Sequence, residues 1–289
     1  MALSGRDLLE RAQAQAAPLP PLLVEALRVA EATLQGAHGR RRSGPGDSFW
    51  QFRRYQPGDP ATSIDWRQSA RSDALYVRET EWAAAQTVMI WPDPSPSMRW
   101  SSGKALPAKR DRAALLALSL AVLLVDAGER VGLLGDALAP VGGHPLLPRL
   151  AGALVAQADS SSWPAAATPP RQSRVLLLSD FLVEAQTLAT TLTTWAGQGV
   201  SGYLVHVIDP AEETLPYEGR VRFSGLEGEA DYLATRAEAL RDAYRDRFAR
   251  HCEDLRAIAR SLGWGIIRHR TDEPVGETLA ALHRMLSGR

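Results

Sequence analysis

The chain has 289 residues, which is enough for one large α/β domain, or for one such domain and a smaller module. Its formal net charge is zero, so the composition gives no indication of a nucleic-acid partner or of an anionic membrane surface. The single cysteine, Cys252, excludes an internal disulfide and a metal site built from several thiolates, and we therefore expect a cytoplasmic protein.

No targeting or transmembrane segment is expected. Residues 1–21 are polar or alanine-rich, with charged side chains where a signal peptide would have its apolar core. The longest apolar run covers residues 113–125, whereas about 20 apolar residues are needed to cross a bilayer. This run therefore predicts a buried helix.

The first 86 residues are expected to form an N-terminal extension made of helices and a β-ribbon. Residues up to about 36 predict two helices, separated by Pro18, Pro20 and Pro21. Residues 37–82 are rich in glycine, arginine and aromatic side chains, and turn signals recur within them. The pattern of residues 74–80 favours a strand.

Residues 87–289 are expected to form the main domain, because strand-like and helix-like segments alternate along them. The expected strands are 87–91, 130–134, 174–179, 200–208 and 265–269. The expected helices are 109–125, 146–156, 183–195, 231–262 and 275–286. A proline- and serine-rich stretch, 159–171, predicts an exposed loop. Apolar strands that alternate with helices are typical of a Rossmann-like α/β fold, with a mostly parallel sheet and helices on both faces.

Two strands of the expected sheet end in residues whose side chains carry oxygen. Asp93, Ser95 and Ser97 follow the first strand, and their spacing in an extended segment places three oxygens on one side of the backbone. Asp180 follows the third strand, and ligands of open α/β sheets gather at the carboxyl ends of strands. Oxygen ligands suit a hard cation such as Mg²⁺, so these four residues are the candidate metal ligands.

A structural role is the alternative for the same residues. Aspartate and serine after a strand are common turn residues and helix caps. Short motifs of this kind also occur by chance, so the spacing alone leaves both interpretations open.

The segment Asp93-Pro94-Ser95-Pro96-Ser97 resembles the DxSxS motif of the metal-ion-dependent adhesion site in von Willebrand factor A-like domains. A longer pattern precedes it and resembles the signature of the bacterial "domain of unknown function 58" family. That pattern comprises Phe49, Arg54-Tyr55, Pro57-Gly58-Asp59, Ile64-Asp65-Trp66-Arg67, Ser69-Ala70-Arg71 and Val77-Arg78-Glu79. The resemblance covers residues 39–183 well and the remainder loosely.

The resemblance implies a von Willebrand factor A-like fold and a site for Mg²⁺ or Mn²⁺. Members of the family are often encoded beside MoxR-type AAA+ ATPases, which implies a protein partner: such an ATPase or its client, with peripheral contact to a membrane complex allowed. The usual threonine ligand of the adhesion site has no clear counterpart in this chain. The candidates are Thr168 and the serines Ser160, Ser161 and Ser162.

Charged and aromatic residues of the signature are candidates for an interface, or for docking the N-terminal region onto the sheet. They are Arg54, Asp59, Asp65, Trp66, Arg67, Arg71, Arg78 and Glu79. Arginine suits this role because its guanidinium binds carboxylates through two hydrogen bonds. The arginines at 40–42 and 53–54 could form a basic patch, but a solvated turn in which they pair with nearby aspartates is the favoured interpretation.

No enzyme signature is found in the sequence. The chain lacks a GxSxG nucleophile elbow, a GxxxxGKS/T phosphate loop and a GxGxxG turn after a strand. Cys252, His144 and His206 are assigned to structural roles. The favoured hypothesis is a non-enzymatic, metal-dependent protein-interaction module that partners a MoxR-type AAA+ ATPase in the assembly or activation of other proteins. A metal-dependent phosphoesterase and a scaffold with a vestigial metal site are the alternatives.

Overall fold

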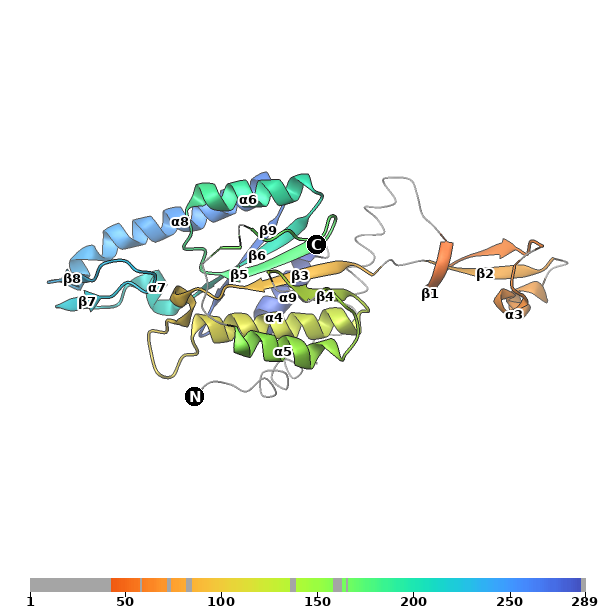
Figure 1. Ribbon diagram of the computed structural model, residues 1–289, viewed down its shortest axis with the longest axis horizontal. Coiled ribbons are helices and arrows are strands. Elements are labelled where there is room, and N and C mark those ends of the chain that lie inside the picture. The colour runs from red at the N-terminus through yellow and green to blue at the C-terminus, as the bar shows by residue number, and fades with distance from the viewer. Residues whose placement is uncertain are drawn as a thin grey trace. The chain divides into compact units, whose positions relative to one another are not determined.

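The computed structural model of the chain describes residues 43–57, 59–71, 74–81, 85–135, 139–157, 163–164 and 166–286. These residues fall into two units, one ending at Ala85 and the other beginning at Gln86 (Figure 1). The two helices expected before residue 37 lie outside the described residues, as do the arginines at 40–42.

The first unit is an antiparallel β-ribbon, as expected for this region. β1 (Ser43–Arg54) pairs with β2 (Tyr76–Glu81), which confirms the strand predicted at 74–80. The connection between the strands holds a 3₁₀ helix, η1 (Ala61–Ser63), and a short helix, α3 (Trp66–Ser69).

The polar residues of the ribbon mainly order its own turns. The guanidinium of Arg53 donates two hydrogen bonds to the carboxylate of Asp59, at 2.9 and 3.0 Å. Asp65 caps α3 by accepting a hydrogen bond from the backbone N–H of Gln68 at 2.9 Å. The side chain of Trp66 is exposed. An interface role for these residues stays a prediction.

The second unit is built on a five-stranded sheet with the order β4-β3-β5-β6-β9. Its strands are β3 (Thr87–Pro92), β4 (Arg130–Leu133), β5 (Arg174–Ser179), β6 (Ser201–Ile208) and β9 (Gly265–Arg270). Every neighbouring pair is parallel, so the carboxyl ends of all these strands lie at the same edge of the sheet.

Helices cover both faces of this sheet (Figure 1). α4 (Lys109–Asp126), α5 (Leu146–Ala156) and α9 (Val275–Leu286) lie on one face. α6 (Ala185–Gly197) and α8 (Arg241–Ser261) lie on the other. The predicted α/β fold, with a parallel sheet between two helical layers, is confirmed.

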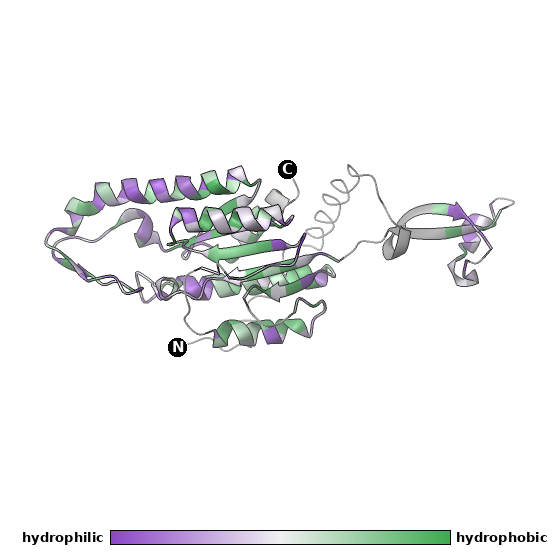
Figure 2. Ribbon diagram, turned by 45° about the horizontal axis from the view of Figure 1, so that its top comes forward, coloured by the Kyte–Doolittle hydropathy of each residue, from purple (hydrophilic) through white to green (hydrophobic). Residues whose placement is uncertain are grey.

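Apolar strands form the centre of the second unit, between helices that carry both polar and apolar residues (Figure 2). Leu177 and Leu204 of the sheet are fully buried in one cluster with Leu192 of α6 and Leu255 of α8. Each such leucine contributes roughly 1.5–3 kcal/mol of burial free energy. The apolar run at 113–125 lies within α4 and is buried almost throughout, as predicted. Among the described residues, no helix is both long and apolar enough to cross a membrane.

The helix predicted at 231–262 is wrong over its first ten residues. Tyr232–Ala234 instead forms β8, which pairs antiparallel with β7 (Val221–Phe223), and a 3₁₀ helix, η3 (Ala237–Leu240), precedes α8. The pairing with β7, together with a hydrogen bond from Ala237 N to Gly219 O at 2.8 Å, overrides the helix propensity of this segment. A short helix that was not predicted, α7 (Pro210–Thr214), follows β6. The other predicted strands and helices of this unit are present within two residues of their expected bounds.

Candidate metal site at the carboxyl edge of the sheet

The parallel pairing of β3 and β5 brings the two predicted aspartates to one edge of the sheet. Pro92, the last residue of β3, lies opposite Leu178 of β5, and Asp93 N donates to Leu178 O at 2.9 Å. Asp180 follows β5 directly. The two chain segments that were predicted to hold the metal are therefore neighbours.

The Asp93 loop is a compact cluster of oxygens. One carboxylate oxygen of Asp93 accepts from Ser95 N at 2.8 Å, and the other accepts from the Ser179 hydroxyl at 2.5 Å. Ser95 has an extended backbone, and Pro96 then begins a 3₁₀ helix, η2 (Pro96–Arg99). This turn places Ser95 Oγ and Ser97 Oγ only 3.0 Å apart. Asp93, Ser95 and Ser97 are thus brought together as predicted.

Burial dominates the electrostatics of Asp93. The residue is 1% exposed, and its hydrogen-bond partners in the described chain, Ser95 and Ser179, are uncharged. Burial raises the pKa of Asp93 to about 7, with the hydrogen bond from Ser179 acting against it and the charge of Asp180 adding to it. A cation beside this carboxylate would favour its ionised form.

Asp180 has a very different environment, which the sequence did not predict. Its Oδ2 accepts from Nζ of Lys109 at 2.8 Å, and the same ammonium donates to Glu212 Oε1 of α7 at 2.5 Å. Burial lowers the pKa of Lys109, but the two carboxylates outweigh it, so the pKa is raised and the lysine keeps its charge. The carbonyl oxygen of Asp180 also lies 3.1 Å from Nε2 of His251.

His206, in β6, is a further buried titratable residue near Asp180. It is packed against the rings of Phe181, Phe248 and His251, and burial lowers its pKa to about 3. A histidine that stays neutral in an apolar packing arrangement fits the structural role assigned to it. Cys252, one residue after His251, is buried.

The donor set at Asp93 fits a small divalent cation. Mg²⁺ binds oxygens at about 2.0–2.1 Å in an octahedron, whose neighbouring ligands lie about 2.9 Å apart. The 3.0 Å between the hydroxyl oxygens of Ser95 and Ser97 matches that separation. Among the described residues there is no group of three or more His, Cys, Asp or Glu side chains that could hold a metal, so hydroxyls are needed at this site.

The threonine of the adhesion site has no counterpart among the described residues near this loop. Thr168, one candidate, is exposed in the segment before β5. The serines at 160–162 lie outside the described residues.

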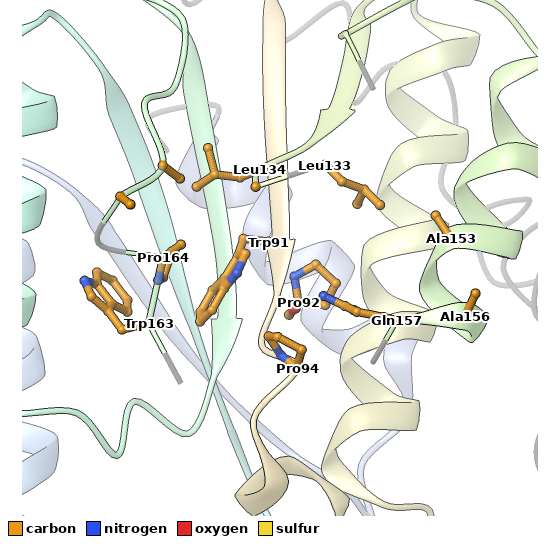
Figure 3. A pocket seen from close by; sticks show the side chains of 13 residues that line it. Trp91, Pro92, Pro94, Leu133, Leu134, Ala153, Ala156, Gln157, Trp163 and Pro164 are labelled. Atoms are coloured by element: carbon orange, nitrogen blue, oxygen red, sulfur yellow. Dashed lines mark hydrogen bonds between the residues drawn. The ribbon is translucent and has the colours of Figure 1, made fainter. Parts of the chain in front are cut away.

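A separate pocket of about 700 Å³, lined mainly by residues with apolar side chains, borders the Asp93 loop through Pro94 (Figure 3). Trp91 and Trp163 line it, with their ring centroids 5.6 Å apart in an edge-to-face arrangement. Trp163 is 7% exposed, so the prediction of an exposed loop at 159–171 is wrong at this residue, because its indole packs into the core. None of the described lining residues has a titratable side chain. The described part of the pocket therefore offers no side-chain acid or base.

The structure thus defines a protein with a parallel α/β domain that carries an acidic, hydroxyl-lined loop at the carboxyl edge of its sheet. Residues 51–254 match the family described as "Protein of unknown function DUF58", and the chain belongs to this family. The resemblance found in the sequence is therefore confirmed.

The chain is also similar to curated relatives and to solved structures. The chain is 27% identical to the uncharacterized proteins Mb1516 of Mycobacterium bovis and Rv1480 of Mycobacterium tuberculosis, over 93% of this chain and 90% of theirs. An aerotolerance-related membrane protein from Bacteroides fragilis aligns with 71% of this chain and 100% of its own, at 15% identity and a TM-score of 0.42. BatB from Bacteroides thetaiotaomicron aligns with 71% of this chain and 98% of its own, at 14% identity and a TM-score of 0.41.

Proposed function

We propose that this protein is a non-enzymatic interaction module that binds an acidic side chain of a partner protein through a divalent cation, Mg²⁺ or Mn²⁺. Asp93, Ser95 and Ser97 would hold the cation. The observation that carries the proposal is the pair of hydroxyl oxygens 3.0 Å apart beside a buried carboxylate whose hydrogen-bond partners, among the described residues, are uncharged.

The chemistry of this donor set favours recognition of a carboxylate. A cation held by one aspartate and two neutral hydroxyls keeps a net positive charge, and its remaining positions are filled by water or by an incoming oxygen. When bound, it supplies a positive centre for a carboxylate oxygen of the partner. Ser95 and Ser97 are 0% and 5% exposed, so the site is recessed and favours a side chain that protrudes from the partner's surface.

The groups around the loop do not favour catalysis. A hydrolase would need a general base within hydrogen-bond reach of the attacking water. Lys109 is held between two carboxylates, and His206 is packed among aromatic rings with a lowered pKa. Neither side chain is suited to take a proton near neutral pH.

The family supports a partner of the MoxR type. Because the resemblance implies that members of this family are often encoded beside MoxR-type AAA+ ATPases, we propose that the partner is such an ATPase or one of its clients.

Direct titration with Mn²⁺, followed by electron paramagnetic resonance of the unbound ion, tests the metal site. Wild type is expected to bind one ion, and Asp93→Ala and the double variant Ser95→Ala/Ser97→Ala are each expected to weaken binding about tenfold or more. Asp126→Asn is the matched control, because Asp126 is an exposed carboxylate at the opposite end of α4. Equal affinity in all four proteins would refute the metal site.

Capture of the purified MoxR-type ATPase from the same organism tests the partner. Capture is expected with wild type in Mg²⁺, and is expected to be lost with a chelator or with Asp93→Ala. Equal capture in all conditions would refute the metal-bridged contact. Turnover of p-nitrophenyl phosphate or bis(p-nitrophenyl) phosphate that disappears in Asp93→Ala would instead favour the phosphoesterase.

A further inference from the structure

We infer that Lys109 is a built-in cation that withholds Asp180 from the metal and so limits the affinity and the ligand set of the site. This inference rests on the proposed function and deepens it. It assigns the predicted fourth ligand, Asp180, to the lysine, and leaves the metal to Asp93, Ser95 and Ser97.

The geometry around Lys109 is that of a buried charge with two counterions. Its side chain is 1% exposed and those of Asp180 and Glu212 are 4% and 19% exposed. The ammonium lies 2.8 Å from Asp180 and 2.5 Å from Glu212. Lys109 is the first residue of α4, whereas Asp180 follows β5 and Glu212 lies in α7. The three groups therefore meet only because the sheet brings three distant segments together.

The carboxylate of Asp180 has both oxygens occupied by donors. Oδ2 accepts from Lys109, and Oδ1 accepts from the backbone N–H of Leu182 at 3.2 Å. A divalent cation that approached Asp180 would meet the lysine charge within hydrogen-bond distance of its ligand. Repulsion between like charges in a poorly hydrated site is strong, because few water dipoles screen it.

Asp93 presents the opposite case on the same edge. Its partners, Ser95 N and Ser179 Oγ, are donors without charge, and they leave the carboxylate's charge uncompensated. A cation is therefore directed to the Asp93 loop and away from Asp180. The sequence motif alone does not distinguish the two aspartates; the lysine does.

A purely structural role for Lys109 makes different predictions. Buried ion pairs often serve only to join segments, and breaking one destabilises the fold without changing a nearby site. If Lys109 only joins α4, β5 and α7, its replacement lowers stability and leaves the metal affinity unchanged. If it withholds Asp180, its replacement makes metal binding tighter.

Mn²⁺ titration of the full chain separates these roles. The principal variant is Lys109→Met/Glu212→Gln, which removes one positive and one negative charge and so keeps the net charge of the cluster while it releases Asp180. We expect it to bind Mn²⁺ about tenfold more tightly than wild type, a difference of about 1.4 kcal/mol. Unchanged or weaker binding, in a variant shown to be folded by circular dichroism, would overturn the inference.

Asp180→Asn provides a second measurement that does not require replacing the lysine. It is expected to weaken Mn²⁺ binding less than about threefold in wild type, and to abolish the gain of about tenfold in the Lys109→Met/Glu212→Gln background. A loss of about tenfold in wild type itself would show that Asp180 is already a ligand and would overturn the inference.

The outcomes also distinguish this inference from the proposed function. If wild type binds no Mn²⁺ and Lys109→Met/Glu212→Gln does so through Asp180, the inference stands and the metal-dependent function fails. If wild type binds Mn²⁺ through Asp93 and the double variant binds it equally well, the function stands and the inference fails. If neither protein binds Mn²⁺, both fail.

Discussion

The ends of β3 and β5 carry the same chemical group, equally buried, in opposite electrostatic surroundings. Asp93 is 1% exposed and, in the part of the chain that the structure describes, its hydrogen-bond partners are uncharged, whereas Asp180 is 3% exposed and contacts the ammonium of Lys109. A buried carboxylate without a counterion is costly, so only Asp93 gains from an external cation. Position at the sheet edge makes both residues candidates for a ligand, but the charge of the neighbours decides which of them is one.

The largest expected effect on stability comes from replacing Lys109 alone, which tests whether it is the counterion of Asp180. Lys109→Met leaves Asp180 and Glu212 buried without their counterion, and we expect a loss of roughly 3–5 kcal/mol in the free energy of unfolding. Urea denaturation in the presence of a chelator measures it. The matched control is Lys104→Met, which removes the chain's other lysine at an exposed position and should change stability by less than about 0.5 kcal/mol. Similar losses in the two variants would contradict the buried counterion role.

His269 extends the comparison to a base with an uncharged partner. It is 0% exposed and its Nδ1 lies 2.6 Å from the hydroxyl of Thr278. Burial lowers its pKa to about 4, helped by the charge of Arg112 and opposed by that of Asp272. Below about pH 6.5 the unfolded chain protonates this histidine, whereas the folded chain does not do so until the pH approaches 4. The contribution of His269 to the free energy of unfolding is therefore fully present above about pH 6.5 and is lost as the pH falls towards 4.

The expected size of this effect is up to roughly 3 kcal/mol between pH 6.5 and 4. His269→Gln should remove this contribution from the pH dependence of the unfolding free energy, measured by urea denaturation at several pH values, while the contribution of buried His206 remains. His144→Gln, at an exposed histidine, should keep both contributions. Parallel pH profiles for wild type and His269→Gln would show that the buried histidine does not contribute.

The fold was largely predictable because its information is local. Most strands of the sheet are short apolar runs between turn residues, and most of the helices are marked either by apolar periodicity or, as at residues 113–125, by a long apolar run. The hairpin of β7 and β8 could not be predicted in this way. Tyr232–Ala234 is too short to show a strand pattern, and it is a strand only because it pairs with Val221–Phe223, across a turn.

For the candidate site too, residues that are close in the sequence were predictable and residues that are far apart in it were not. Asp93, Ser95 and Ser97 lie within five residues, so their spacing made them candidates for a shared site before the fold was known. Lys109 is 71 residues from Asp180 and 103 from Glu212, and only the folded sheet brings them together. One signal was present in the sequence. Lys109 is one of only two lysines in a chain that otherwise uses arginine, and it is the first residue of a helix whose later residues are mostly buried.

Neutralising Asp93 and Asp180 one at a time compares directly how much each carboxylate contributes to stability. Asp180→Asn removes one of the two carboxylates that hold Lys109, and we expect a loss of about 2 kcal/mol in the free energy of unfolding. Asp93→Asn removes a charge that lacks a counterion, and in a chelator it should change stability by less than about 1 kcal/mol or increase it. Urea denaturation of both variants checks this. A larger loss for Asp93→Asn than for Asp180→Asn would reverse the assignment of the two groups.

A further expected effect concerns the hydroxyl of Ser179, one of the uncharged partners of Asp93. The Ser179 hydroxyl donates to Asp93 at 2.5 Å and accepts from Phe181 N at 2.7 Å, so Ser179→Ala should lower the free energy of unfolding by about 1–2 kcal/mol. The same substitution in an Asp93→Asn background separates the hydrogen bond to Asp93 from the hydrogen bond to Phe181. A hydrogen bond to a charged carboxylate is stronger than one between uncharged groups, so replacing Asp93 should weaken the first and leave the second unchanged. We expect the cost to be smaller in that background. An equal cost in both backgrounds would mean that Ser179 serves only Phe181, and the carboxylate of Asp93 would then depend still more on a cation from outside.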